Sequence, residues 1–208
     1  GKNADLLLKK DDGWHAHNTI WRSAVKGLER ALRKSGTGER SLEDCSVLVF
    51  GAGRLAQTMV YGIQRRRASV SVTCGSDADE NIGFCEQCGA SLNIEVTDSE
   101  VLAQTFNSTY VPFSEIYQTK PDVAVFADPA LEMGYSRTEL NPSFLRPPMI
   151  VIDVTTMPQE GDFIIEARRR SCTVVTPRQV YGDQISAMFK SITGKELPAE
   201  ALLNLPGE

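Results

Sequence analysis

Runs of apolar residues alternate along this chain with stretches in which apolar positions recur at helical spacing. The runs predict strands at residues 47–50, 68–74, 121–127, 149–154 and 172–175. The helical spacing predicts helices at 20–32, 55–65, 77–88, 163–170 and 183–193. Weaker patterns suggest strands at 3–9 and 92–96, a turn at 10–13, a helix at 99–107 and an extended segment at 110–113. Strands that alternate with helices predict an α/β fold, with a doubly wound, mostly parallel sheet and helices on both of its faces.

The strand at 47–50 leads directly into a Gly-x-Gly-x-x-Ala turn at 51–56, and a helix follows. This context is typical of a Rossmann-type dinucleotide-binding turn. Gly51 permits the sharp turn, Gly53 removes a side chain that would block a pyrophosphate, and Ala56 lets helix and strand pack closely. The unpaired amides at the helix N-terminus favour the negative charge. The alternative is a glycine turn that ends the strand for structural reasons alone. The predicted cofactor-binding residues here are Gly51, Ala52, Gly53, Arg54 and Leu55.

Composition and charge narrow the function classes. The 208 residues are 41% hydrophobic and 24% charged, which is typical of a soluble globular protein, and the net charge is −5. Without a basic excess, nucleic acid and anionic membrane are disfavoured as partners. Arg65-Arg66-Arg67 is interpreted as a solvated helix end. Since no apolar run approaches the roughly 20 residues of a membrane helix, and the start does not resemble a signal peptide, we expect a cytoplasmic protein.

The cysteines and histidines suggest neither a disulfide framework nor a metal site. Five widely spread cysteines are an odd number, which argues against a set of paired disulfides. Cys85-x-x-Cys88 lies in a predicted helix, and no second pair or His-x-x-x-His motif completes a zinc site. His15 and His17 have no carboxylate and nucleophile arranged around them in the sequence. We therefore expect reduced thiols, no bound metal and no nucleophilic triad.

Several short segments follow one another in a fixed order. They are Lys2-Asn3-Ala4, then Ala16-His17-Asn18-Thr19-Ile20, then Gly51-Ala52-Gly53, then Asp153-Val154-Thr155-Thr156-Met157-Pro158, and finally Gln184 ten residues before Gly194. In this order and spacing they resemble the shikimate dehydrogenase family. The corresponding family segments are Ala-Val-Asn-Thr, Gly-x-Asn-Thr-Asp, a Gly-Ala-Gly-Gly turn, Asp-x-x-Tyr-x-Pro, and a Gln-Ala-x-x-x-Phe helix that ends in Gly. The resemblance covers nearly the whole chain.

The resemblance implies a chemistry and a set of ligands. Members of the family interconvert 3-dehydroshikimate and shikimate, in aromatic amino acid biosynthesis by the shikimate pathway, through hydride transfer with NADP. By position, Asn3, Asn18 and Gln184 would bind the substrate, residues 51–53 would hold the pyrophosphate, and Asp153 would organise a strand end.

The family also implies a domain arrangement. Residues 1–40 would be the tail of a substrate domain with a linking helix, and 41–178 the dinucleotide-binding Rossmann domain. Residues 179–208 would be a C-terminal helix that returns toward the substrate domain. The rest of that domain would precede this chain, in some members behind a 3-dehydroquinate dehydratase.

The chain also departs from the family pattern. The family's catalytic Asp is Ile20 here, and its catalytic Lys would belong to the preceding domain, so no catalytic residue is assigned. The family's Asn-Arg-Thr, whose Arg binds the 2′-phosphate of NADP, reads Cys74-Gly75-Ser76, and Ser76 is kept as a cofactor candidate. Arg54 could replace that Arg and favour NADP, whereas Asp77 could hold a ribose and favour NAD. The cofactor is therefore NADP or NAD.

Three functions follow from these matches and departures. The first is the cofactor-binding part of a shikimate dehydrogenase-like oxidoreductase. The second is a degenerate, non-catalytic domain that supports an attached enzyme such as 3-dehydroquinate dehydratase. The third is another Rossmann oxidoreductase with a different substrate.

Overall fold

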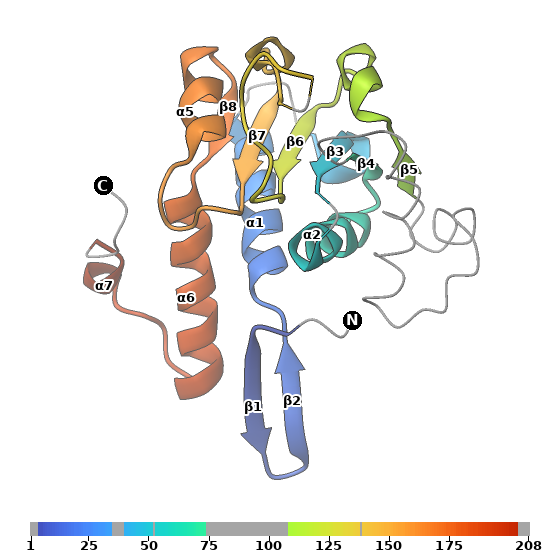
Figure 1. Cartoon of the computed structure of the whole chain (residues 1–208). Coiled ribbons are helices and arrows are strands. Elements are labelled where there is room, and N and C mark those ends of the chain that lie inside the picture. The colour runs from blue at the N-terminus through green and yellow to red at the C-terminus, as the bar shows by residue number, and fades with distance from the viewer. Residues whose placement is uncertain (1–3, 35–39, 52, 74–107, 138, 204–208) are drawn as a thin grey trace, which may run out of the picture.

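The computed structural model describes residues 4–34, 40–51, 53–73, 108–137 and 139–203 (Figure 1). The elements predicted at 77–88, 92–96 and 99–107 lie outside these residues. Every other strand predicted from a buried run is present within one or two residues of its expected bounds.

The central element is a six-stranded parallel sheet. Its strands are β3 (Ser46–Phe50), β4 (Ser69–Thr73), β5 (Ser108–Tyr110), β6 (Val123–Phe126), β7 (Ile150–Asp153) and β8 (Thr173–Val175). They lie in the order β5-β4-β3-β6-β7-β8, so the direction of winding reverses between β3 and β6. In a doubly wound sheet, ligands bind beyond the carboxyl ends of the strands at this reversal. The predicted Rossmann-type α/β fold is confirmed.

Helices cover both faces of the sheet because side chains alternate along each strand. Val47 and Val49 of β3 face α1 (Ile20–Lys34), α2 (Arg54–Gln64) and the start of α6 (Pro177–Thr193). Leu48 and Phe50 face the other layer, which holds α5 (Asp162–Arg169) and the 3-10 turns η2 (Phe113–Gln118) and η3 (Pro142–Phe144). A short 3-10 turn, η1 (Leu42–Asp44), precedes β3, and α7 (Ala199–Leu203) follows α6.

A hairpin of β1 (Leu6–Lys10) and β2 (Gly13–His17) projects from one end of the molecule (Figure 1). The sequence predicted β1 and the turn but assigned residues 14–19 to the entry into α1, which is wrong for β2. The strand was missed because its pattern is inverted: Trp14 is 70% exposed, while His15 and His17 are half-buried. The arrowheads of β6 and β7 point toward this end, so the carboxyl edge of the sheet faces the hairpin.

Helix α6 begins six residues earlier than the predicted start at residue 183. Thr176 and Gln179 form a capping box around Pro177, a start signal that is readable in the sequence and was missed. The helix ends at Gly194 in the left-handed conformation, as predicted. Its neighbour is α1, to which Asp183 is bound by ion pairs from Lys26, at 2.8 Å, and Arg30. These contacts fix the part of α6 that runs toward the hairpin.

Candidate functional site

The turn between β3 and α2 is built around two glycines with different roles. Gly51 has a φ of +126°, and a Cβ placed there would lie 2.9 Å from the backbone carbonyl carbon and oxygen of Ala127. Its N–H donates to the backbone oxygen of Thr73 at 2.8 Å. Glycine is therefore required at position 51 by the turn and by the chain that leaves β6. This confirms the sharp turn and adds a contact that the sequence did not reveal.

Gly53 leaves open space in front of α2. It is the N-cap of the helix, its φ is −72°, and no side chain caps the helix from this position. A Cβ built on Gly53 meets no heavy atom of the described residues within 4 Å. Arg54 is exposed, Leu55 is half-buried, and Ala56 is fully buried. Around the Cβ position of Gly53 the bend is not filled by described side chains, and no side chain of Gly53 caps the first amides of α2.

A cavity of about 380 Å³ lies beyond the carboxyl ends of β6 and β7, next to the reversal of the sheet. Among its lining residues are Asp128, Leu131, Met133, Asp153, Gly161 and Phe163. Asp128 also lies next to the glycine turn, since its Cβ would be 3.1 Å from a Cβ placed on Gly51, so the cavity and the turn share this residue. Such concave, mixed surfaces at the reversal point are where dinucleotides bind in this fold class.

Asp153 organises the wall of this cavity. Its carboxylate is fully buried and accepts hydrogen bonds from the backbone N–H of Thr155 at 2.8 Å and from the Thr155 hydroxyl at 2.6 Å. Burial raises the pKa of the Asp153 carboxyl above its ordinary value, although the hydrogen bonds from Thr155 and Thr156 oppose the rise. These contacts are the organising role expected for a residue at a strand end.

Asp153 also predicts a pH dependence. Because its pKa is raised, the folded state holds the proton more tightly than the unfolded chain between the ordinary value of 3.8 and the raised value. The stability that Asp153 contributes is present below pH 3.8 and is lost as the pH rises through the folded pKa. In urea unfolding, Asp153→Asn should therefore gain stability relative to wild type between pH 4 and pH 7. The exposed Asp11→Asn is the control, and an Asp153→Asn difference that stays constant with pH would contradict the assignment.

Two of the predicted substrate residues, Asn18 and Gln184, form hydrogen bonds near the start of α1. Asn18 accepts a hydrogen bond at Oδ1 from the backbone N–H of Trp21 at 3.3 Å. Gln184 reaches across from α6, and its Nε2 donates to Asp5 Oδ2 at 3.3 Å. The same carboxylate accepts from the backbone N–H groups of Thr19 and Ile20 and from the Thr19 hydroxyl, at 2.7 to 2.9 Å. Sequence reasoning missed Asp5, since no local pattern marks a contact with a residue 179 positions away.

Three of the predicted site residues, Asn3, Ala52 and Ser76, lie outside the described residues, as does Asp77. Ile20 is the first residue of α1, is half-buried and packs against the core. Its hydrocarbon side chain supplies no proton-transferring group. The catalytic residue stays unassigned.

No group of three or more metal-binding side chains occurs among the described residues. Within the same residues, no helix is long and apolar enough to cross a membrane.

Comparison with protein families and curated proteins gives a consistent group of relatives. No family model matches the chain. The shikimate dehydrogenase (NADP(+)) of Syntrophobacter fumaroxidans is 23% identical over 176 residues, which cover 82% of this chain and 52% of that protein. The shikimate dehydrogenase (NADP(+)) of Staphylococcus aureus is 22% identical over 194 residues, covering 92% of this chain and 62% of that protein. The chain thus spans about half to three fifths of the length of these curated relatives.

Solved structures agree with this result. Shikimate dehydrogenase from Aquifex aeolicus superposes with a TM-score of 0.67 at 18% identity, covering 96% of this chain and 65% of that one. Quinate dehydrogenase from Corynebacterium glutamicum, in complex with NAD, gives 0.65 at 20% identity over 94% and 64% of the two chains. The Thermus thermophilus shikimate 5-dehydrogenase, with NADP(H) and shikimate, gives 0.63 at 17% identity over 94% and 64%. These likenesses show the fold, and both curated relatives are shikimate dehydrogenases.

Proposed function

We propose that this chain is the cofactor-binding part of a shikimate dehydrogenase-like oxidoreductase, which interconverts 3-dehydroshikimate and shikimate with NADP or NAD. The observation that carries the proposal is the open bend at Gly53, where an uncapped α2 begins beside the reversal of the sheet. A bound pyrophosphate accepts hydrogen bonds from such backbone amides and is favoured by the helix dipole.

The residues around the bend fit a nicotinamide dinucleotide, which supplies or accepts the hydride when bound. In this proposal the backbone of residues 51–53 and the amides of Arg54 and Leu55 hold the pyrophosphate. The exposed Arg54 guanidinium is available to a 2′-phosphate, which favours NADP, as in the curated relatives named for NADP(+). Ser76 stays a proposed contact, and the NAD complex of quinate dehydrogenase supports keeping NAD as the second cofactor.

On the substrate side, Asn18 and Gln184 supply amide groups for a hydroxylated ligand, and Asn3 is proposed as a third contact. Asn18 and Gln184 both lie near the start of α1, at the end of the molecule toward which the sheet directs its carboxyl edge (Figure 1). A cofactor at the glycine turn and a substrate near Gln184 would thus approach from the same side.

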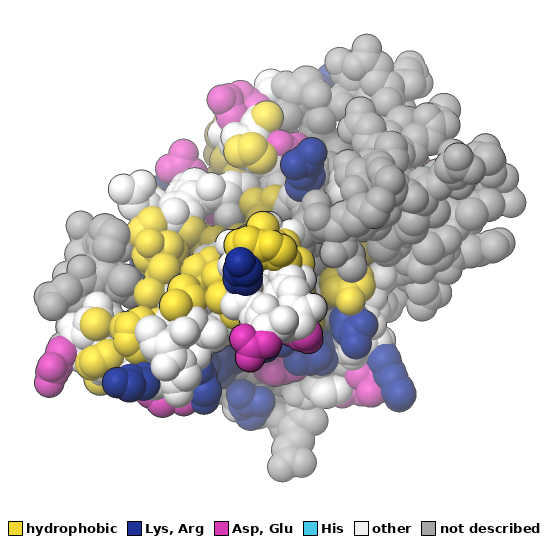
Figure 2. Space-filling view, turned by 90° about the horizontal axis from the view of Figure 1, so that it is seen from below, with side chains coloured by type: hydrophobic (Ala, Val, Ile, Leu, Met, Phe, Trp, Pro, Cys, Tyr) yellow, Lys and Arg dark blue, Asp and Glu magenta, His cyan; other side chains and the backbone are white. Residues whose placement is uncertain are grey.

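We also propose that residues 1–40 are the tail of a substrate domain, and that the rest of this domain precedes the chain and covers the hairpin. A two-stranded hairpin by itself is marginal in water. Leu7 and Trp14 are 62% and 70% exposed, and hydrophobic side chains gather beside the hairpin on the side of α6 (Figure 2). The curated relatives are longer than this chain, in keeping with such a domain. The boundaries at 1–40, 41–178 and 179–208 stay part of this proposal, and the last of them falls in the first turn of α6.

Calorimetric titration with NADPH and NADH tests cofactor binding. Wild type should bind at least one of them, and Gly53→Trp should weaken binding by about 100-fold or more because the indole occupies the space of the phosphates. The melting temperature of Gly53→Trp should stay close to that of wild type, since the site is open. Ile192→Trp, at a 63% exposed position on α6, is the matched control and should bind normally. Equal, negligible heats for wild type with both cofactors would refute the proposal.

Ile20 favours a second candidate function, a non-catalytic domain that supports an attached enzyme. A general acid or base typically contributes 10² to 10⁴-fold to a rate, and the side chain of Ile20 provides neither. Assaying shikimate oxidation by the full-length gene product separates the two functions. Turnover at an ordinary enzyme rate would exclude the non-catalytic reading.

A further inference from the structure

Asp5 ties together three segments that are distant in the sequence. Its carboxylate accepts hydrogen bonds from Thr19 N at 2.7 Å, from Thr19 Oγ1 at 2.8 Å and from Ile20 N at 2.9 Å, all at the start of α1. It also accepts from Gln184 Nε2 of α6 at 3.3 Å. Asp5 itself precedes β1, where its N–H donates to the backbone oxygen of His17 at 3.0 Å. The hairpin, α1 and α6 therefore meet at one side chain.

The chemistry of this contact sets the orientation of the Gln184 amide. A carboxylate has only acceptor oxygens, so the atom that Gln184 turns toward Asp5 has to be its NH₂ group. The opposite orientation would bring two acceptors together. The carbonyl Oε1 of Gln184 is therefore directed away from Asp5, whichever way the two amide atoms are drawn.

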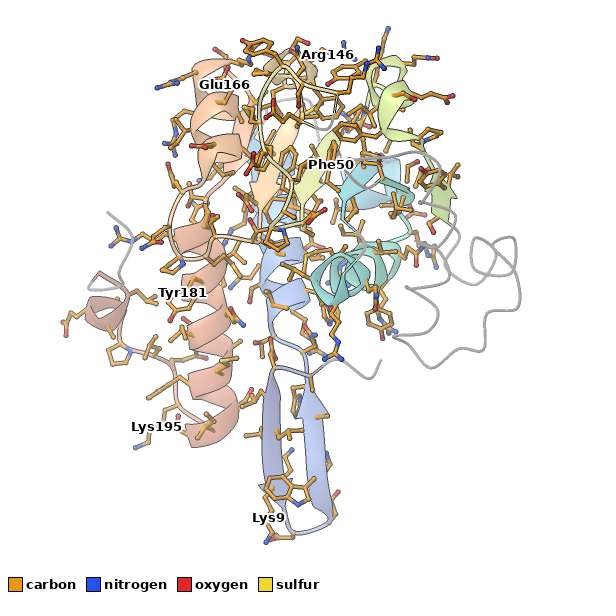
Figure 3. All side chains as sticks on the ribbon, in the orientation of Figure 1. Lys9, Phe50, Arg146, Glu166, Tyr181 and Lys195 are labelled. Carbon is orange, nitrogen blue, oxygen red and sulfur yellow. The ribbon has the colours of Figure 1, made fainter. Side chains whose placement is uncertain are left out.

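The backbone of Gln184 is held as firmly as its side chain. Asp183, the preceding residue, is bound to α1 by Lys26 and Arg30. This part of α6 continues past Tyr181 toward the level of the hairpin, whose tip carries Lys9 (Figure 3). With the backbone anchored by Asp183 and the amide nitrogen anchored by Asp5, little freedom is left for Gln184 to turn its amide over.

We propose that Asp5 is a positioning residue that fixes Gln184 as a hydrogen-bond acceptor toward the substrate, a role that rests on the proposed function. An acceptor at this place selects a ligand group that can donate, such as a hydroxyl, over a ketone, which can only accept. Asp5 acts through Gln184, because its own oxygens are already occupied by donors from α1 and α6.

The decisive variant is Asp5→Asn in the full-length protein. Asparagine is as good a helix cap as aspartate, so the fold is preserved. The contacts from Thr19 Oγ1, Ile20 N and Gln184 Nε2 all reach Oδ2 of Asp5, so the single amide oxygen of asparagine takes that place. A neutral oxygen then replaces the carboxylate toward Gln184, and the weaker hydrogen bond no longer holds the Gln184 amide in one orientation. The side-chain NH₂ signal of Gln184, identified in ¹⁵N-resolved NMR by its loss in Gln184→Ala, should shift in Asp5→Asn. It should not move in Asp11→Asn, which changes an exposed residue of the hairpin turn.

Shikimate binding, measured by calorimetry on the same variants, provides the functional readout. Asp5→Asn and Gln184→Ala should each weaken binding by about tenfold, and the double variant should be no weaker than Gln184→Ala alone, because both changes remove one interaction. Losses that multiply in the double variant would overturn the proposal, as would a Gln184 signal that is the same in Asp5→Asn and wild type. If wild type fails to bind shikimate, the proposed function fails, and the Gln184 signal then decides only whether Asp5 sets the orientation of the Gln184 amide.

Discussion

Replacing Gly51 by alanine should destabilise the protein by roughly 2 to 5 kcal/mol. The φ of +126° is strained for any residue with a side chain, and the added Cβ would lie 2.9 Å from backbone atoms of Ala127. Since the obstacle is backbone, no rotation of a side chain can relieve the contact. Either β6 or the turn has to move. Thermal and urea unfolding of Gly51→Ala against wild type measures the loss.

Gly53→Ala is the matched control for that experiment. Its φ of −72° suits any residue, and a Cβ meets no described heavy atom within 4 Å. Its stability should stay within about 0.5 kcal/mol of wild type. Equal stability of the two variants would show that the turn does not adopt the conformation described above. The pair also separates folding from binding, because the glycine needed for folding and the one proposed for the phosphates are two residues apart.

Truncating Phe126 to alanine should cost about 3 to 5 kcal/mol. The ring is fully buried and stacks on Phe163 of α5 with centroids 4.1 Å apart, and on Phe50 of β3 at 4.8 Å. Phe50, labelled in Figure 3, lies at the end of the strand that leads into the glycine turn. Removing the middle ring would leave a cavity between the sheet and α5.

The measurement is the free energy of unfolding in urea, with Ile165→Ala as the control on α5. Ile165 is 38% exposed, so its truncation should cost much less. A loss below 1 kcal/mol for Phe126→Ala would mean that the aromatic stack does not form. We also expect weaker cofactor binding in this variant, because Phe126 directly precedes Ala127, the residue against which Gly51 is packed.

The strands and helices that the sequence predicted well are those with a strong local signal. The run at 47–50 and the two glycines after it specify a strand, a turn and a helix within ten residues. The helix around Leu28 and the end of α6 at Gly194 carried equally local marks. The beginning of α6 also carries a local signal, the capping box of Thr176 and Gln179. The predicted start at residue 183 was therefore wrong because this signal was overlooked.

Strand β2 is a different kind of error. Its exposed Trp14 and half-buried His15 and His17 oppose the usual pattern of hydrophobic residues inside. A pattern-based prediction assumes that the hydrophobic face is already covered within the chain. Where a hydrophobic face is covered by a segment outside the described residues, as proposed for the hairpin, that assumption fails. The exposed Leu7 and Trp14 therefore indicate an interaction surface on the hairpin and are a poor guide to its secondary structure.

The amino-acid sequence by itself determined the α/β class, the open glycine turn and the family resemblance, because each depends on residues that are close together or on their order. The tertiary structure alone decided that Gly51 is packed against Ala127 and that Gln184 meets Asp5. Propensities and turn chemistry act over a few residues, whereas these contacts join segments that only the complete sheet and the α1–α6 pair bring within hydrogen-bond or van der Waals distance. The orientation of an amide toward a ligand belongs to this second class, since its partner is set by the fold.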